Sequence, residues 1–294
     1  MERIKVAIFG YGNIGRFAVS AVEAAADMEL VGVVCPEADT VKGVRAVVEV
    51  EALAAFDVVM LCVPTLIAEK YAVHFLENGI NTVDCFDIHS AIWDYRGKLD
   101  QAARAGQASA IVAAGWDPGS DSVVRALMEA CAPRGLTHTN FGPGMSMGHT
   151  VAAKAKPGVT EAVSVTIPVG YGVHHRLVYV QLEPGAELAE VRADIKADPY
   201  FAHDETHVFA VENVADYIDR GHSVKIERKG VSGTTDNQNF HFSMSINNPA
   251  LTAQIMTSCA RAVVRQAPGA YTMVEIPMID LLPGDKEKLV RRLV

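Results

Sequence analysis

The chain has few of the features that mark secreted, membrane-bound or nucleic-acid-binding proteins. Only five of its 294 residues are cysteines, and they are scattered without a Cys-x-x-Cys pair. An odd, scattered set argues against a disulfide framework, so we expect reduced thiols. The sequence contains no Lys/Arg block and its formal net charge is −9. This charge balance disfavours nucleic acid or an anionic membrane surface as a partner.

Long apolar runs are also missing. Stretches such as 58–63 are far too short to cross a bilayer. The chain passes from Met1 almost directly into an apolar strand pattern at Ile4, so we expect no signal peptide and a cytoplasmic location. Half of the residues are apolar, which is enough for a sizeable core, and the length favours two domains.

The first 118 residues alternate predicted strands and helices. Short apolar strands are expected at 4–9, 30–34, 57–63, 81–85 and 110–114, and helices near 16–26, 66–78 and 98–106. Strands separated by helices at this spacing predict an α/β fold with a Rossmann-type, doubly wound parallel sheet. We therefore expect a dinucleotide-binding domain over 1–118.

The pattern changes after residue 119. Apolar and polar residues nearly alternate at 163–167, 177–181, 207–211, 224–228 and 240–246, with one helix near 185–197. Period-two alternation is typical of a sheet with one open face. We predict a second, α+β domain with a mixed open sheet over 119–248, used for substrate binding and dimerisation into a homodimer. Pro249 opens a long helix, and we expect 249–294 to pack back on the first domain.

A glycine-rich turn follows the first predicted strand. Its sequence is Gly10-Tyr11-Gly12-Asn13-Ile14-Gly15, and a predicted helix comes next. In this context Gly10 permits a tight turn, Gly12 lets the backbone approach a pyrophosphate, and Gly15 allows close packing of helix on strand. The helix N-terminus adds free N–H groups and partial positive charge. The turn predicts a nicotinamide dinucleotide site and hence an oxidoreductase.

The end of the second strand bears on the choice between NAD and NADP. Cys35-Pro36-Glu37 offers a carboxylate and no cation, which favours NAD, although Lys42, Arg45 and Arg16 are cations that could lie nearby. Ligands of such sheets bind at the carboxyl ends of the strands. We therefore expect further cofactor contacts from Cys62, Val63, Pro64, Thr65, Cys85, Phe86, Asp87, Gly115, Trp116, Asp117 and Pro118.

Two acidic residues follow predicted strands at this edge. Asp87 closes the segment 84–87, and Asp117 lies in Gly115-Trp116-Asp117-Pro118-Gly119. Carboxylates beside a nicotinamide suit a substrate that carries an ammonium group. Two simpler interpretations stay open, because Asp117 can cap a helix before Pro118 and Asp87 can be a turn residue.

The second half contains further candidates. The glycine-rich segment 140–149 predicts a backbone that approaches a ligand such as a carboxylate. Thr166, Arg176, His222 and Asn248 lie downstream, and each can equally be a surface or capping residue. The adjacent pair His174-His175 points to opposite faces of a strand, so we expect no metal site there or elsewhere.

Taken together, these motifs resemble the meso-diaminopimelate dehydrogenase family from residue 4 to about 280. The segments that carry the resemblance are 6–16, 84–87, 115–119, 141–149 and Asn247-Asn248-Pro249. The short second half is similar to the subgroup that also accepts other D-amino acids. The resemblance implies reversible oxidative deamination of the D-centre of meso-2,6-diaminopimelate, with NADP as cofactor. The products are ammonia and L-2-amino-6-oxopimelate, which cyclises to tetrahydrodipicolinate, a precursor of lysine and peptidoglycan.

The same resemblance implies roles for individual residues. Asp87, Trp116 and Asp117 would surround the D-centre, and either carboxylate is a candidate proton acceptor. Met147 and Gly148 would contact the substrate from the glycine-rich segment. The distal L-centre would be held by Thr166, Arg176 and His222. Phe141 would form the wall of the pocket, and Asn248 would hydrogen-bond the substrate.

One departure and three rival functions stay open. The family places arginines after the second strand, whereas this chain has Cys35-Pro36-Glu37, so we expect NADP with a weakened preference and leave NAD or dual use open. The rivals are a dehydrogenase of other D-amino acids or diamines, a semialdehyde dehydrogenase with an activated cysteine, and a non-catalytic dinucleotide sensor.

Overall fold

The computed structural model describes residues 3–41, 43–218 and 221–294. By its internal contacts the chain divides into two compact units. Unit 1 comprises Met1–Ala126 with Pro249–Val294, and unit 2 comprises Leu127–Asn248. No helix of the described residues has the length and hydropathy that a membrane span requires.

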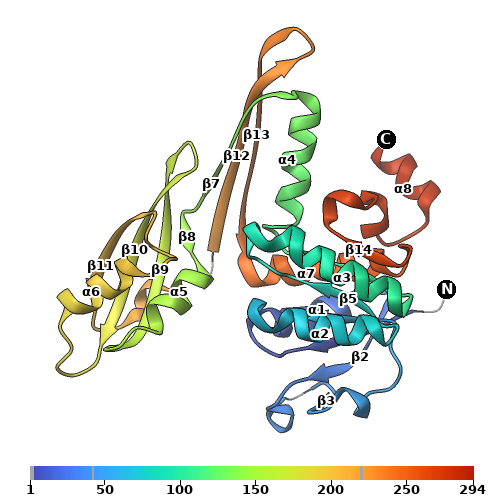
Figure 1. The fold of residues 1–294 in the computed structure, drawn as a ribbon, viewed down its shortest axis with the longest axis horizontal. Coiled ribbons are helices and arrows are strands. Elements are labelled where there is room, and N and C mark those ends of the chain that lie inside the picture. The colour runs from blue at the N-terminus through green and yellow to red at the C-terminus, as the bar shows by residue number, and fades with distance from the viewer. Residues whose placement is uncertain (1–2, 42, 219–220) are drawn as a thin grey trace. The chain divides into compact units, whose positions relative to one another are not determined.

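Unit 1 is built on a seven-stranded sheet whose paired strands are all parallel. The strand order is β14-β6-β5-β4-β1-β2-β3, which confirms the predicted Rossmann-type sheet (Figure 1). Two strands of two and three residues, β3 and β14, were not predicted because they are too short to give a pattern. The bounds are β1 (Ile4–Phe9), β2 (Met28–Val34), β3 (Ala46–Val47), β4 (Val58–Leu61), β5 (Asn81–Asp84), β6 (Ser109–Ile111) and β14 (Gly269–Tyr271).

Helices cover both faces of this sheet. Val6, Ala7 and Ile8 of β1 are all fully buried, as expected of a central parallel strand. Val6 and Ile8 belong to a core shared with α1 and α7, and Ala7 belongs to a second core shared with α2 and α3. The helices of this unit are α1 (Asn13–Glu23), α2 (Thr65–Glu77), α3 (Ile92–Gly106), α7 (Asn248–Val263) and α8 (Lys286–Leu293), and α4 (Ser120–Cys131) begins in it.

The C-terminal segment completes unit 1. Met256 and Cys259 of α7 are fully buried in the core that contains β1. Arg261, further along the same helix, donates to both carboxylate oxygens of Asp27 at 2.5 and 2.8 Å, just before β2. A bidentate pair of this kind fixes both position and orientation. The pair therefore holds α7 to the beginning of β2.

Unit 2 contains two sheets and two helices. The first sheet has the order β11-β10-β9-β8 and is mixed, because β10 and β11 are parallel whereas the other pairs are antiparallel. This confirms the predicted α+β unit with a mixed sheet. The second sheet, β13-β12-β7, is antiparallel and was not distinguished from the first. The bounds are β7 (Arg134–Phe141), β8 (Gly144–Met145), α5 (Met147–Lys154), β9 (Val159–Gly170), β10 (Val173–Leu182), α6 (Leu188–Ala197), β11 (Glu205–Ala210), β12 (Gly221–Ser232) and β13 (Thr235–Asn247).

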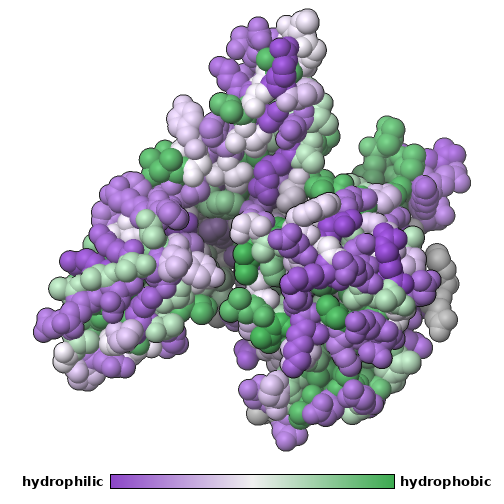
Figure 2. Space-filling view, in the orientation of Figure 1, coloured by the Kyte–Doolittle hydropathy of each residue, from purple (hydrophilic) through white to green (hydrophobic). Residues whose placement is uncertain are grey.

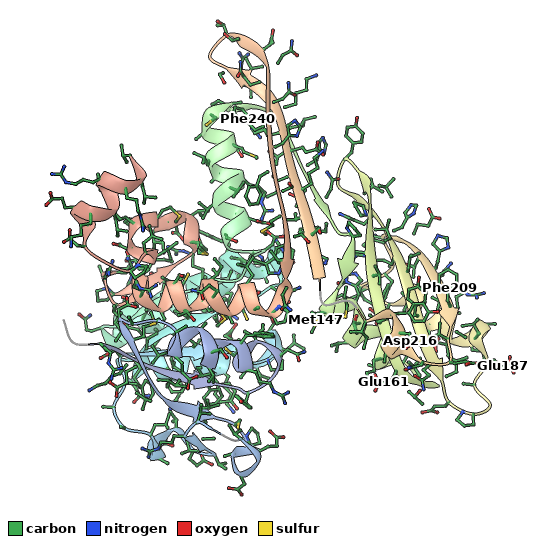
Figure 3. The ribbon with its side chains drawn as sticks, turned by 180° about the vertical axis from the view of Figure 1, so that it is seen from behind. Met147, Glu161, Glu187, Phe209, Asp216 and Phe240 are labelled. Carbon is green, nitrogen blue, oxygen red and sulfur yellow. The ribbon has the colours of Figure 1, made fainter. Side chains whose placement is uncertain are left out.

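The helices of unit 2 cover only one face of the four-stranded sheet. Val178 and Val180 of β10 are fully buried and share a core with Ile195 of α6. Side chains on the other face of β10 and β11 are more exposed, and Phe209, seen from behind in Figure 3, is 44 % exposed. On the side seen in Figure 2 both units carry mostly hydrophilic side chains, in keeping with the charged composition.

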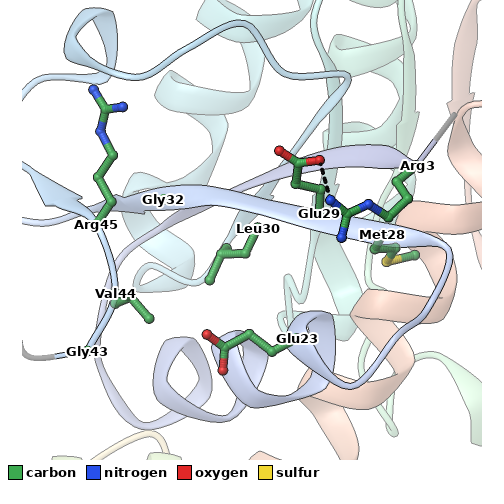
Figure 4. Close-up of a pocket in the computed structure, with 9 residues that line it drawn as sticks. All are labelled: Arg3, Glu23, Met28, Glu29, Leu30, Gly32, Gly43, Val44 and Arg45. Carbon is green, nitrogen blue, oxygen red and sulfur yellow. Dashed lines mark hydrogen bonds and ion pairs between the residues drawn. The ribbon is translucent and has the colours of Figure 1, made fainter.

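A hollow of about 380 Å³ lies beside β2 in unit 1 (Figure 4). It is lined by Arg3, Met28 and Glu29, which lie at the amino ends of β1 and β2. A second hollow of about 1070 Å³ in unit 2 lies along β7, β12 and β13. No residue that the sequence assigns to the site lines either hollow.

Candidate active site

The three glycines of the turn after β1 have three different surroundings. Gly10 has a φ of +103°, and a Cβ there would lie 2.4 Å from the carbonyl oxygen of Cys62. A Cβ on Gly15 would lie 2.1 Å from the carbonyl oxygen of Gly10. A Cβ on Gly12 would have no neighbour within 4 Å. Gly10 and Gly15 are thus required by the protein itself, whereas Gly12 leaves open space at the end of α1.

The N-terminus of α1 fits an anionic group. Gly12 is its N-cap, no side chain caps the helix, and no acidic side chain lies in its first turn. The first N–H groups of a helix have no intrahelical partner, and the helix dipole adds positive charge. Open space and uncapped N–H groups at one place are what a pyrophosphate needs. Tyr11, Asn13 and Ile14 lie in this same turn.

The other predicted cofactor residues follow strands that are neighbours of β1. Cys62 and Val63 follow β4, and Pro64 is the N-cap of α2, which begins at Thr65. Cys85 and Phe86 follow β5, while 115–118 come shortly after β6. Because β1, β4, β5 and β6 are parallel and consecutive in the sheet, their carboxyl ends lie along one edge. The structure therefore brings these predicted residues to the same edge as the glycine turn.

The segment after β2 has few cations at hand. Cys35 is buried, Glu37 is exposed, and burial raises the pKa of the Cys35 thiol. The Arg45 guanidinium donates to the carbonyl oxygen of Ala52 at 2.5 Å, and that of Arg16 lies 5.6 Å from the ring centroid of Tyr11. The third cation considered from the sequence, Lys42, lies outside the described residues.

Asp84 organises the edge of the sheet from inside. Its carboxylate is fully buried and accepts hydrogen bonds from the backbone N–H groups of Phe86 at 3.0 Å and Ala113 at 3.2 Å. It also accepts from the Tyr95 hydroxyl at 2.9 Å. Burial raises the pKa of Asp84 to about 6, although these hydrogen bonds oppose the shift. Asp84 therefore joins the segments that carry Asp87 and Trp116.

Asp87 is exposed and is held by a hydrogen bond from the beginning of α2. The Thr65 hydroxyl donates to its Oδ1 at 2.6 Å. This contact joins the beginning of α2 to the segment after β5, and it leaves the second carboxylate oxygen for other donors. A fixed but exposed carboxylate suits the binding of a cationic group.

Trp116 and Asp117 lie in a compact turn before α4. Trp116 is 7 % exposed and the Asp117 side chain is 3 % exposed. A Cβ on Gly119, whose φ is +141°, would lie 1.9 Å from the carbonyl oxygen of Gly115, so only glycine fits there. Arg125 of α4 donates to the Asp117 carboxylate and balances its charge. Asp117 is therefore an ion-paired carboxylate.

Asp121 is an acidic residue that the sequence argument missed. It lies four residues after Asp117 and is fully buried, and neither carboxylate oxygen has a hydrogen-bond partner among the described residues. Burial, followed by repulsion from Asp117, raises its pKa to about 7, and Arg125 opposes this shift. The signal available in the sequence was the spacing of four between Asp121 and Arg125, which puts both on one side of α4.

The thiols at this edge are not activated. Burial raises the pKa of Cys62 to about 12 and that of Cys85 well above its ordinary value. A nucleophilic cysteine needs a lowered pKa, because the thiolate is the reactive form. These surroundings argue against the semialdehyde dehydrogenase alternative.

Unit 2 contains a buried guanidinium. Arg176 of β10 is 9 % exposed and lies opposite Thr166 of β9 in the antiparallel pair. Its Nη1 donates to the Thr166 hydroxyl, and its Nε donates to Asp204 Oδ2 at 2.6 Å. Sequence reasoning missed Asp204, which precedes β11 and has no local motif. Nη2 has no hydrogen-bond partner among the described residues, and a carboxylate is the group that a guanidinium fork binds best.

Neutral histidines surround this guanidinium. Burial, followed by the charge of Arg176, lowers the pKa values of His222 and His149 to about 4 and lowers that of His174. The backbone N–H of Phe141 donates to His174 Nε2 at 2.8 Å, and the Phe141 ring centroid lies 6.5 Å from that of His222. Arg176 is therefore the only one of these groups that carries charge at neutral pH.

The glycine-rich segment 140–149 differs from the prediction in its first part. Cβ atoms on Gly142 and Gly144 would each lie 2.3 Å from a backbone oxygen, that of Thr166 and that of Gly221 respectively. At these two glycines the close approach is thus between parts of the protein backbone. Gly148 differs, since a Cβ there would meet only the Tyr200 ring, at 3.2 Å.

Met147 and Gly148 begin helix α5 (Met147 is labelled in Figure 3). Ser146 is the N-cap, but no side chain caps the helix and its first turn has no acidic residue. The Ser146 hydroxyl instead contacts His149 Nδ1 at 2.8 Å. The N–H groups of this turn can therefore bind a carboxylate. Asn248, the last predicted substrate residue, begins α7 and is half-buried.

Comparison with known proteins identifies the family. A family model described as the diaminopimelic acid dehydrogenase C-terminal domain matches residues 115–173. A Bacteroides fragilis protein named meso-diaminopimelate D-dehydrogenase is 53 % identical over all of both chains. The chain belongs to the meso-diaminopimelate D-dehydrogenase family. The resemblance inferred from the sequence motifs is thereby confirmed.

Solved structures agree with this membership. The C. glutamicum diaminopimelate dehydrogenase in complex with diaminopimelate is 30 % identical, covers 100 % of both chains and gives a TM-score of 0.89. An engineered D-amino acid dehydrogenase bound to NADP⁺ is 28 % identical, covers 99 % of this chain and 100 % of its own, and gives a TM-score of 0.86.

Proposed function

We propose that this dehydrogenase catalyses the reversible oxidative deamination of the D-centre of meso-2,6-diaminopimelate with NADP as cofactor. The observation that carries the proposal is the 53 % identity, over the full length of both chains, to a protein named for this activity. The buried Arg176 and the carboxylates at the edge of the sheet of unit 1 are the local features that suit a diamino-dicarboxylate.

The reaction removes a hydride from the amino-bearing carbon and a proton from its nitrogen. The bound nicotinamide supplies the hydride acceptor for the hydrogen on the substrate Cα. The amine loses its proton, an imine remains, and water hydrolyses it to a ketone and ammonia. The chain itself orients the substrate, which is worth several orders of magnitude in rate.

Residues of unit 1 bind the reacting centre in this proposal. Asp117 is paired with Arg125, and Asp87 is anchored by Thr65, so two carboxylates can orient an ammonium group. Either can receive the proton that the amine releases. Trp116 provides the apolar wall of this part of the site. The helix N-terminus at Gly12 binds the pyrophosphate of the cofactor.

Residues of unit 2 bind the two carboxylates in this proposal. The distal carboxylate binds Arg176, beside Thr166 and His222, while the carboxylate of the reacting centre binds the N–H groups at Met147 and Gly148. Asp204 neutralises Arg176 before substrate arrives, so the guanidinium stays buried without an uncompensated charge. Phe141 closes the pocket, and Asn248 donates a hydrogen bond to the substrate.

For the cofactor we propose NADP with a smaller preference over NAD than arginines after β2 would give. The engineered dehydrogenase bound to NADP⁺ supports NADP, and Glu37 in place of a cation supports the weak preference. We expect ratios of kcat/KM for NADP over NAD below about a hundredfold, or about 3 kcal/mol. A preference far above that would contradict the weakened discrimination.

The test of the function is a turnover assay with purified enzyme. We expect reduced cofactor to form with meso-diaminopimelate but not with the LL isomer, which has no D-centre. The variant Asp117→Asn should lower kcat/KM about a hundredfold while the Kd for the cofactor stays unchanged. Asp94→Asn, at an exposed position on α3, is the matched control. Equal rates with both isomers would refute the proposed stereochemistry.

A second candidate is a dehydrogenase of broader D-amino acid specificity. It is supported by the likeness to an engineered D-amino acid dehydrogenase. A panel of D-amino acids in the same assay distinguishes the two, because a broad enzyme turns over D-alanine and D-leucine at rates comparable to those with diaminopimelate.

We also propose that the chain acts as a homodimer. The hairpin between β9 and β10 exposes Val169, Tyr171 and Val173, which are 55, 83 and 54 % exposed, and a second copy would cover them. Light scattering during size exclusion should give twice the chain mass of 31.5 kDa. The mass of a single chain would exclude this assembly.

A further inference from the structure

Three side chains that the proposed reaction does not use come together on unit 2. His175 of β10 faces Glu205 of β11 in the parallel pair, and His207 follows Glu205 by two residues. Paired residues of parallel strands share a face, as do residues two apart in one strand. All three side chains therefore project from one face of the sheet. Phe209, labelled in Figure 3, continues the same face along β11.

The contacts within this group join nitrogen and oxygen atoms that can coordinate a metal ion. His175 Nε2 lies 3.1 Å from Glu205 Oε2, and His207 Nε2 lies 2.9 Å from Glu205 Oε1. The three residues can each present one ligand atom such that all three atoms lie within 4.8 Å of one another. Each carboxylate oxygen is thus matched to a different imidazole nitrogen. A lone pair on each Nε2 and on the carboxylate is the donor set of a borderline divalent cation.

We propose that His175, Glu205 and His207 form a Zn²⁺ site. Two imidazole nitrogens and one carboxylate oxygen are the protein ligands of a zinc site that keeps a fourth position for water. Tetrahedral coordination at about 2.0–2.2 Å puts ligand atoms about 3.3–3.6 Å apart. The three ligand atoms here lie within 4.8 Å of one another before any adjustment. The side chains are 35, 60 and 46 % exposed, which leaves their rotamers free to adjust.

This group is separate from the proposed substrate residues. His174 and Arg176, which flank His175, point to the opposite face and are buried, whereas Asp204 binds Arg176 and its neighbour Glu205 binds the histidines. The strand alternation that made a shared site for His174 and His175 improbable is thus correct. The sequence alone does not point to this group, because Glu205 and His207 come from another strand than His175.

Zinc at this position would join an edge strand to its neighbour. β11 is the outermost strand of its sheet, and His175 and His207 lie on different strands. A ligand that binds only the folded chain stabilises it by mass action. We therefore expect Zn²⁺ to raise the Tm of the protein.

The test is calorimetric titration of metal-free, tag-free protein with ZnCl₂ at pH 7.5. We expect one equivalent per chain in the wild type, and at least about tenfold weaker binding, or about 1.4 kcal/mol, in His175→Gln and in His207→Gln. His241→Gln is the matched control. It removes an exposed histidine whose Nδ1 lies 3.3 Å from Glu227, but which is not part of a metal-binding group among the described residues.

Each outcome of this titration either supports or overturns the proposed zinc site. Loss of binding in both site variants, with retention in the control, supports the site. No binding by the wild type, or equal binding by all four proteins, overturns it. Thermal unfolding without zinc should give the same Tm for all four and thereby exclude misfolding. Turnover of meso-diaminopimelate by His207→Gln should equal that of the wild type, so failure of the zinc site and failure of the proposed function are distinguishable.

Discussion

At the scale of single residues, we propose that Arg176 discriminates between substrates. Its guanidinium is buried, bound to Asp204 and Thr166, and surrounded by histidines whose lowered pKa values keep them neutral. A monocarboxylic amino acid has nothing to offer this charge, whereas the distal carboxylate of a diamino-dicarboxylate does. Specificity for the longer substrate is therefore expected to come from one side chain.

Replacing Arg176 by Met tests this directly. We expect kcat/KM for meso-diaminopimelate to fall about a hundredfold or more, because a charge-assisted contact of about 3 kcal/mol is lost. The value for D-alanine should change less than about threefold. The double variant Arg176→Met/Asp204→Asn is the control, because the single variant leaves the Asp204 carboxylate without its ion-pair partner. Equal losses with both substrates would show that Arg176 supports the fold and not recognition.

Asp121 predicts a pH-dependent stability. Its pKa is about 7 in the folded chain and its ordinary value is 3.8. Between these values the folded chain binds more protons than the unfolded chain, so the free energy of unfolding falls as pH rises from about 4 to about 7. Asp121→Asn removes this contribution to the pH dependence of the free energy of unfolding.

The measurement is urea unfolding of the wild type and of Asp121→Asn at pH 5 and pH 8. The wild type should lose about 1–3 kcal/mol more than the variant between the two conditions. Asp194→Asn, at an exposed position on α6, should behave as the wild type does. A variant that loses as much stability as the wild type would mean that Asp121 is ionised in the folded protein throughout this range.

At the scale of elements, the glycine turn and α1 form the part of the site most accessible to sequence reasoning. The order strand, Gly-x-Gly-x-x-Gly, helix is local, and each glycine has the surroundings that its position predicts. Strand patterns were equally local, so β1, β2, β4 and β5 were found at nearly their true bounds. The two-residue β3 and three-residue β14 have no pattern to find.

Two glycine variants separate fold from cofactor binding in this element. Gly15→Ala should cost about 2–3 kcal/mol of stability, because its Cβ would lie 2.1 Å from the carbonyl oxygen of Gly10. Gly12→Ala should leave Tm unchanged, since a Cβ there has no protein neighbour within 4 Å, but should weaken cofactor binding at least about tenfold. Thermal unfolding and fluorescence titration with NADPH provide the two readouts. Normal cofactor binding by Gly12→Ala would place the pyrophosphate elsewhere.

Contacts between elements were the part that sequence reasoning could not reach. Asp204 binds Arg176 from a different strand segment, and Glu205 meets His175 only because β10 and β11 pair in one register. The glycine-rich segment was expected to approach a ligand, whereas Gly142 and Gly144 within it allow other parts of the backbone to come close. A glycine-rich pattern predicts close approach, but the sequence does not say what approaches.

At the scale of the whole molecule, each unit binds a different part of the reactants in the proposed function. Unit 1 offers the glycine turn, Asp87, Trp116 and Asp117 for the cofactor and the reacting carbon, and unit 2 offers Arg176 for the far end of the substrate. Family membership supports the activity, while the proposed binding roles of the two units are inferred from the side chains that each unit contains. The central claim is that the D-centre is the end presented to the nicotinamide.

A crystal structure of the complex with NADP⁺ and meso-diaminopimelate tests that claim most directly. The account predicts the D-configured Cα about 3–3.5 Å from C4 of the nicotinamide, its amine bound by Asp87 and Asp117, and the distal carboxylate bound by Arg176. A complex with the L-centre at the nicotinamide, or with the ring remote from both carboxylates, would contradict it.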